Sequence, residues 1–116
     1  MASTMASYDD WKNRRWTVTS SGRGQGNQTH LIPHIAAGNR LKFEGSESAP
    51  QIINESTRTQ WGSGGSYNST EDAIKDVSYN GTTYTIKRAG ASPNATLDCQ
   101  GPAATAVTVW TATEGG

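Results

Sequence analysis

Aromatic side chains set among small polar residues are the feature of this sequence that most suggests chemistry. Trp61 and Tyr67 bracket the glycine- and serine-rich run WGSGGSYN, and Trp11 follows Asp10 near the start of the chain. Sugar-binding sites combine an aromatic ring, which packs on the C–H face of the sugar, with nearby hydroxyl, amide and carboxylate groups. The pattern predicts non-enzymatic carbohydrate binding by a lectin-like protein.

The predicted ligand-binding residues lie in segments that we expect to be loops, where a rigid scaffold presents side chains to a partner. They are Trp61, Tyr67, Asn68, Asp10, Trp11, Arg23 and Asn27. Trp16 and Trp110 fall on regular strand patterns and are expected in the core instead. The expected partners are glycans or glycoconjugates, and a homo-oligomer would bind them more tightly through avidity.

Residues with catalytic spacing are not evident. The sequence has no G-x-S-x-G nucleophile motif, and none of its ten carboxylates stands out as half of an acid–base pair. His30 and His34 would lie on the same side of an extended segment, but no cysteine or carboxylate shares that segment to complete a metal site. We therefore predict no enzyme, no metal site and no cofactor.

A protein-binding defence module, such as a protease inhibitor, is the alternative function. It would present a rigid loop from the same scaffold, with GQGNQ and GSGGSYN as the candidate loops. Neutral formal charge argues against nucleic acid and anionic membranes as partners, since both attract a basic excess. Membrane insertion is not expected, because no apolar run approaches the ~20 residues of a spanning helix.

The expected location is the cytoplasm. The sequence begins MASTMASYDD, without the apolar core of a signal peptide, and Cys99 is its only cysteine, so no internal disulfide is possible. Secretion after removal of a signal peptide is the alternative. In a secreted protein, the asparagines of the five N-x-S/T triplets would be glycan acceptors; they are Asn27, Asn54, Asn68, Asn80 and Asn94.

The clearest element is a β-hairpin over residues 74–88, centred on Asn80-Gly81. Asn-Gly favours a two-residue turn in which both residues take positive φ. This turn places Val77 opposite Tyr84. Val77, Tyr79, Tyr84 and Ile86 then share one face, so the pattern predicts a half-buried antiparallel hairpin.

Other segments predict strands of the same kind. Alternating apolar residues indicate strands at 14–21 and 39–44, and further short strands are expected around 29–37, 51–56, 95–100 and 105–113. Segments 45–50, 61–68 and 89–95 are predicted loops. About eight short strands at this spacing are typical of an all-β sandwich or a closed barrel.

We predict a flexible segment at residues 1–7 and a single β domain at residues 8–116. Ser7 and Asp10 resemble a helix start and predict about one helical turn. In the last strand Val107 and Val109 are expected on one face and Trp110 on the other. The predicted core comprises Trp16, Val18, Leu31, Ile35, Leu41, Phe43, Ile52, Val77, Tyr79, Tyr84, Ile86, Leu97, Val107 and Val109.

Overall fold

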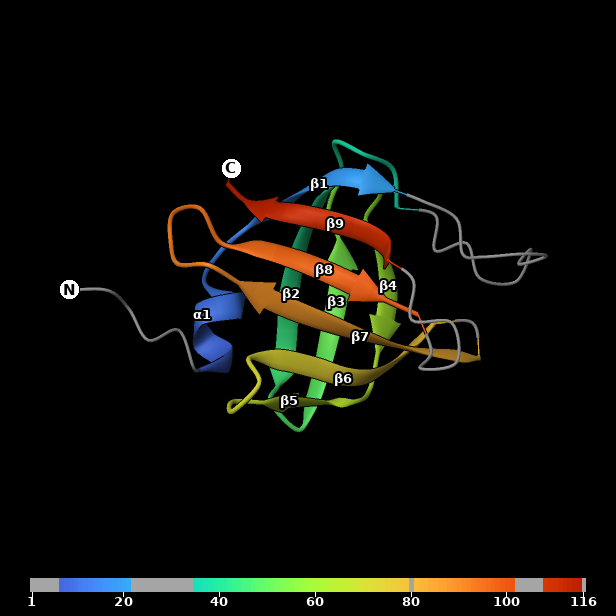
Figure 1. Ribbon diagram of the computed structural model, residues 1–116. Helices are drawn as coiled ribbons and strands as arrows, with labels where there is room; N and C mark the ends of the chain where they lie inside the picture. The colour runs from blue at the N-terminus through green and yellow to red at the C-terminus, as the bar shows by residue number, and fades with distance from the viewer. Residues whose placement is uncertain (1–6, 22–34, 80, 102–107, 116) are drawn as a thin grey trace.

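The computed structural model describes residues 7–21, 35–79, 81–101 and 108–115. Within these ranges it contains one short helix and nine strands (Figure 1). They are α1 (Tyr8–Lys12), β1 (Trp16–Ser21), β2 (Arg40–Ser46), β3 (Ala49–Asn54), β4 (Thr59–Ser63), β5 (Ser66–Asn68), β6 (Ala73–Tyr79), β7 (Thr82–Ala89), β8 (Thr96–Gln100) and β9 (Thr108–Glu114).

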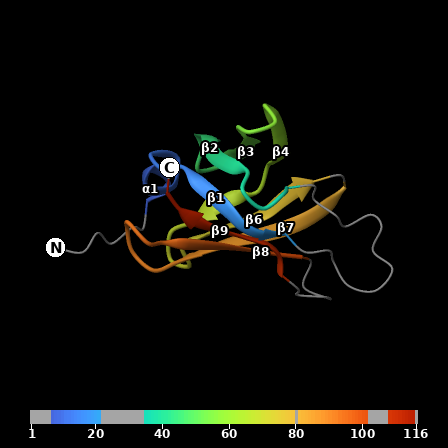
Figure 2. The same cartoon turned by 90° about the horizontal axis from the view of Figure 1, so that it is seen from above.

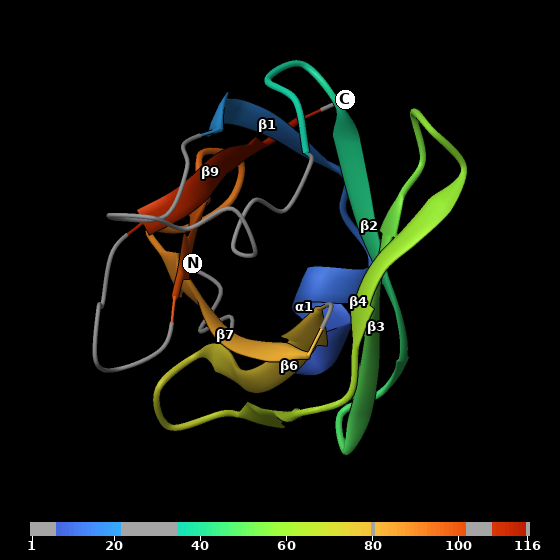
Figure 3. The same cartoon turned by 90° about the vertical axis from the view of Figure 1, so that its right-hand side faces the viewer.

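The strands form one antiparallel sheet that closes on itself. Their order is β4-β3-β2-β1-β9-β8-β7-β6-β5, and β4 also pairs with β6. Strands β2, β3 and β4 cross β6, β7 and β8 at a steep angle (Figures 1 and 2). Seen from the side, the strands trace a ring (Figure 3). The predicted all-β class is confirmed, and the closing pair makes the sheet a barrel.

Helix α1 lies at one end of this ring and is anchored by its buried residues. Ser7 is its N-cap, with Oγ accepting from the backbone N–H of Asp9 across 3.1 Å. Tyr8 and Trp11, three residues apart, share one helix face, and both are buried. A five-residue helix is not stable on its own, so this packing holds it in place.

The β6–β7 hairpin has the predicted register. Val77 pairs with Tyr84, and Tyr79 pairs with Thr82. Gly81 has a φ of 84°, as the turn requires, while Asn80 lies outside the described residues. The predicted inward face is also confirmed, with Tyr79 only partly buried.

A β-bulge in β6 adds one apolar residue to this inward face. Asp76 has a φ of 62°, and the pairing shifts between Ile74 and Val77. The extra residue in β6 turns both Ile74 and Val77 into the core, which simple alternation does not anticipate.

The rest of the core follows the predicted alternation in β1 and β2, with some residues in unexpected places. Leu31 and Val107 of the predicted core lie outside the described residues. The pairing of β8 and β9 shifts between Cys99 and Gln100, so Val109 and Trp110 are both buried rather than on opposite faces. Further buried residues, outside the predicted core, include Tyr8, Trp11, Trp61, Tyr67, Ile74, Cys99 and Ala112.

Three loop or strand predictions are wrong. Segment 61–68 is not a loop, because it belongs to β4 and β5, which are joined by Gly64 and Gly65. Segment 45–50 is mostly strand, with a turn only at Glu47 and Ser48. In the predicted 29–37 strand, the described residues 35–37 are not in a strand, although Ile35 is buried.

The barrel closes along a narrow contact between β4 and β6, which we call the seam. Ser63 pairs with Ser78 there. A Cβ on Gly62 would lie 3.0 Å from the carbonyl oxygen of Ser78, and a Cβ on Gly65 would lie 2.1 Å from that of Lys75. Two glycines therefore let the backbones approach closely enough to close the sheet.

Candidate functional site

The barrel has two chemically different ends. Strands β1 and β6 begin beside α1, and β7 and β9 end there; we call this the helix end. The opposite end carries the turn between Tyr79 and Thr82 and is called the hairpin end. Polar contacts join distant segments at the helix end, where the rings of Trp11, Trp16 and Phe43 also pack together, and a separate group of aromatic rings lies towards the hairpin end.

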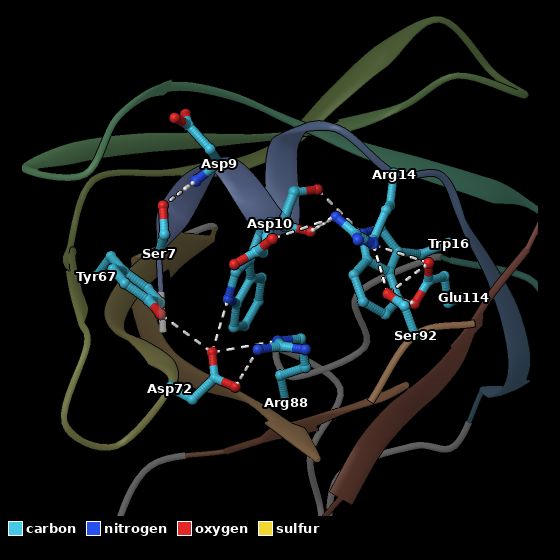
Figure 4. Close-up of polar contacts among 11 residues, drawn as sticks. Ser7, Asp9, Asp10, Arg14, Trp16, Tyr67, Asp72, Arg88, Ser92 and Glu114 are labelled. Atoms are coloured by element: carbon cyan, nitrogen blue, oxygen red, sulfur yellow. Dashed lines mark hydrogen bonds and ion pairs between the residues drawn. The ribbon is translucent and has the colours of Figure 1, made fainter. Parts of the chain in front are cut away.

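Asp72 is the centre of the polar contacts at the helix end (Figure 4). Its Oδ1 accepts from the indole N–H of Trp11 at 3.0 Å and from the hydroxyl of Tyr67 at 3.1 Å. The guanidinium of Arg88 binds both carboxylate oxygens, with Nε 3.2 Å from Oδ1 and Nη2 2.5 Å from Oδ2. This two-point contact fixes the planes of both groups.

The ion pair between Arg88 and Asp72 joins a fully buried cation to a partly exposed anion. The Arg88 side chain is 0% exposed, against 24% for that of Asp72. The backbone N–H of Arg88 also donates to the carbonyl oxygen of Asp72, at 3.0 Å, and Asp72 has a φ of 53°. Removing one partner of a buried ion pair is strongly destabilising. We therefore assign Asp72 a structural role, which is to hold the segments at the helix end together.

A second polar network ties the first and last strands together (Figure 4). Nε of Arg14 lies 2.7 Å from Oγ of Ser92 and 2.8 Å from Oε2 of Glu114. The Ser92 hydroxyl lies 2.8 Å from Oε1 of Glu114, and Nη1 of Arg14 donates to the carbonyl oxygen of Asp10. The Glu114 carboxylate faces the Arg14 cation, whereas activation of a serine nucleophile requires a base such as histidine beside the hydroxyl. We therefore assign these contacts a structural role.

Four aromatic side chains form a cluster towards the hairpin end. The rings of Trp61 and Tyr79 are stacked, with centroids 5.0 Å apart and planes at 9°. Tyr84 lies 5.6 Å from Trp61, and Trp110 meets Trp61 edge-on at 5.8 Å. The Trp61–Tyr79 stack spans the seam, since Trp61 belongs to β4 and Tyr79 to β6. We call Trp61, Tyr79, Tyr84 and Trp110 the aromatic cluster.

Burial controls the ionisation of the groups around these sites. It raises the pKa of Tyr67 to about 12, helped by the Asp72 carboxylate, and it raises the pKa of Tyr84. The pKa of the Cys99 thiol is also raised by burial and by the neighbouring Asp98. All three groups are therefore neutral at physiological pH.

One polar atom of the aromatic cluster has no partner in the described part of the chain. Trp110 is fully buried, and its indole N–H makes no hydrogen bond with any described residue. Buried N–H groups are normally paired, so this donor is a chemical group of the cluster that a ligand could use.

The structure separates the residues that we predicted to bind ligand. Trp11 and Tyr67 come together at the helix end, where both donate to Asp72. Asp10 pairs with Arg14, and Oδ1 of Asn68 accepts from the backbone N–H of Glu71. These side chains hold the fold together at that end.

The expectation of exposed loop aromatics is therefore corrected. Trp11, Trp61 and Tyr67 are 0%, 6% and 9% exposed, because they lie on a helix or on strands with their rings facing the core. Arg23 and Asn27 lie outside the described residues.

Sequence reasoning did not assign Tyr79, Tyr84 and Trp110 to a site. The signal was present, because the hairpin register already placed Tyr79 and Tyr84 on one face. What was missing was the position of Trp61, which depends on β4 meeting β6 across the seam. This contact joins segments on either side of the Gly64-Gly65 turn, whose composition favours a flexible loop.

Comparison with known proteins found no matching family model, no matching curated protein and no matching solved structure. Among the residues that the structure describes, no three histidine, cysteine or acidic side chains are grouped as metal ligands. The described helix is also too short to cross a membrane.

Proposed function

We propose that this protein is a non-enzymatic binding protein for a neutral, hydroxyl-rich ligand of the carbohydrate class. The ligand would bind at the hairpin end, on the aromatic cluster. The observation that supports this most is the Trp61–Tyr79 stack, which holds a partly exposed tyrosine ring flat against a buried indole.

Tyr79 takes the role that the sequence suggested for Trp61. A ring that is backed on one side by Trp61 and touched by Tyr84 keeps one orientation, so little entropy is lost when a sugar stacks on its free side. The mouths of small β-barrels are common sites for such ligands.

The charge and polarity of the chain suit a neutral ligand. The formal net charge is zero. The indole N–H of Trp110, which has no partner among the described residues, offers a donor for a ligand hydroxyl that reaches into the cluster. A ligand that is apolar on one face and hydroxylated at its edge would use both features.

A glycan array probed with labelled protein, repeated with free sugar as competitor, tests this proposal. We expect a coherent set of bound glycans that free sugar displaces. Tyr79→Ala should weaken the binding about fivefold, because an aromatic platform contributes on the order of 1 kcal/mol. Tyr79→Trp should retain it.

Thr83→Ala is the matched control, because Thr83 is an exposed residue of the same hairpin. Its binding should equal that of the unmodified protein. A blank array at high protein concentration would refute the proposal. Inhibition of one protease class would then favour the alternative, a protein-binding defence module.

A further inference from the structure

A hollow on the outer face of β2 and β3 is chemically unlike the aromatic cluster. It has a volume of about 390 Å³ and is lined by Lys42, Ile53, Glu55 and Arg58. Lys42 and Ile53 are directly paired across β2 and β3, so their side chains stand side by side on the outside of the barrel. The apolar side chain of Ile53 therefore lies among the charged side chains of the other three lining residues.

Positive charge predominates around this hollow. Glu55 is already bound by Arg15, at 2.7 Å, while Nζ of Lys42 lies 2.9 Å from Glu44 and 3.7 Å from Glu55. Arg58 makes no ion pair with any residue that the structure describes. Three cations thus face two carboxylates, and one guanidinium remains available for an anion.

The turn that carries Arg58 is held from inside the barrel. Asn54 is buried, and its Oδ1 accepts from the backbone N–H groups of Ser56 and Thr57 at 3.0 and 3.3 Å. Its Nδ2 donates to Asn39 at 3.1 Å. Arg58 itself has a φ of 61°, an uncommon value for a residue with a side chain. Because these hydrogen bonds fix the turn, the backbone of Arg58 is held in one position beside the hollow.

We propose that this hollow binds a small organic anion. The anionic group, a carboxylate or a phosphate, would pair with Arg58 and Lys42, and the body of the ligand would cover Ile53. Guanidinium groups bind both kinds of anion through two parallel hydrogen bonds. The site is independent of the aromatic cluster, because its residues point away from the core.

Two-dimensional NMR of the intact protein tests the proposal with three probes of similar size. Glucuronate carries a carboxylate, glucose 6-phosphate carries a phosphate, and glucose carries neither. We expect at least one of the two anions to shift the backbone amide signals of Lys42, Ile53 and Arg58, and added salt to weaken the effect. The more strongly bound anion identifies the ligand chemistry.

Charge-changing variants make the test specific. Arg58→Gln should weaken anion binding about tenfold, whereas Arg40→Gln removes the same charge from β2 outside the hollow and should leave it unchanged. Glu55→Gln should tighten anion binding several-fold, because it removes a negative charge from the lining of the hollow and breaks the ion pair that Glu55 forms with Arg15. Circular dichroism confirms that each variant is folded.

Two results would overturn the proposal. The first is the absence of shifts at these amides with either anion at tens of millimolar concentration. The second is equal shifts with glucose, which would show that the charge plays no part. Binding of glycans at the hairpin end is measured separately through Tyr79, so the failure of one site does not affect the test of the other.

Discussion

The indole N–H of Trp11 donates to the carboxylate of Asp72 across 3.0 Å, although the two residues are 61 positions apart in the sequence. This bond joins helix α1 to the turn before β6. The same carboxylate binds the fully buried guanidinium of Arg88. One acidic side chain therefore joins the helix to two strands of the barrel.

Asp72→Asn should destabilise the protein by about 2–4 kcal/mol, because it removes the Asp72 charge that faces the buried Arg88 cation. Asparagine retains the shape of the side chain and accepts the positive φ at this position, so the loss reports the charge. Urea unfolding followed by tryptophan fluorescence measures it. Glu71→Gln, one residue away and exposed, is the control and should leave the urea midpoint almost unchanged.

Stability should fall as the pH rises from about 10 to about 12. Burial raises the pKa of Tyr67 to about 12 in the folded protein, whereas a tyrosine in an unfolded chain has a pKa of about 10. In this range the unfolded chain has lost a proton that the folded protein retains, so rising pH favours unfolding.

Thermal melting across this pH range tests the alkaline effect. Tyr67→Phe should show a shallower decline than the unmodified protein, because one of the shifted groups is gone. Tyr8 and Tyr84, whose pKa values are also raised by burial, would maintain the remaining slope. An identical slope in the variant would exclude Tyr67 as a contributor.

Gly65→Ala should destabilise the protein much more than Gly64→Ala, although the two glycines are neighbours with similar positive φ values of 75° and 85°. A Cβ at residue 65 would lie 2.1 Å from the carbonyl oxygen of Lys75, whereas nothing lies within 4 Å of a Cβ at residue 64. We expect about 1 kcal/mol for Gly64→Ala and more than about 3 kcal/mol for Gly65→Ala. Equal losses in chemical denaturation would show that the seam is not closely packed.

Cys99 should resist thiol reagents until the barrel opens. Its side chain is fully buried, and burial raises the pKa of the thiol, which reduces the reactive thiolate. Labelling with a chromogenic disulfide reagent should be negligible in buffer and complete in denaturant. Rapid labelling of the folded protein would contradict the described packing of β8.

Local patterns in the sequence predicted the elements whose partners lie nearby. The Asn80-Gly81 turn set the register of Val77 and Tyr84, and alternation placed Leu41 and Phe43 in the core. Each of these inferences needs only the chain geometry within a dozen residues. They account for the all-β class and for the best-defined hairpin.

The aromatic cluster and the contacts of Asp72 depend on pairings between distant segments, which local sequence patterns do not predict. Trp61 follows polar residues and precedes a glycine-rich run, which favours a loop on composition alone. Its burial arises because glycines at 62 and 65 let β4 approach β6. Nothing in the local sequence pattern marks Asp72 as the partner of Arg88, and only the closed barrel shows that the two side chains, 16 residues apart, face each other.

The pairing of β1 with β9 also has a consequence for how the chain is made in the cell. Arg14 and Glu114 are 100 residues apart, yet their side chains join the segment just before β1 to the end of β9. During synthesis β1 waits with an unpaired edge until β9 has left the ribosome, and such edges promote association with other chains. We therefore expect the nascent chain to be most prone to aggregation while β1 lacks β9, which is when binding by a molecular chaperone would protect it most.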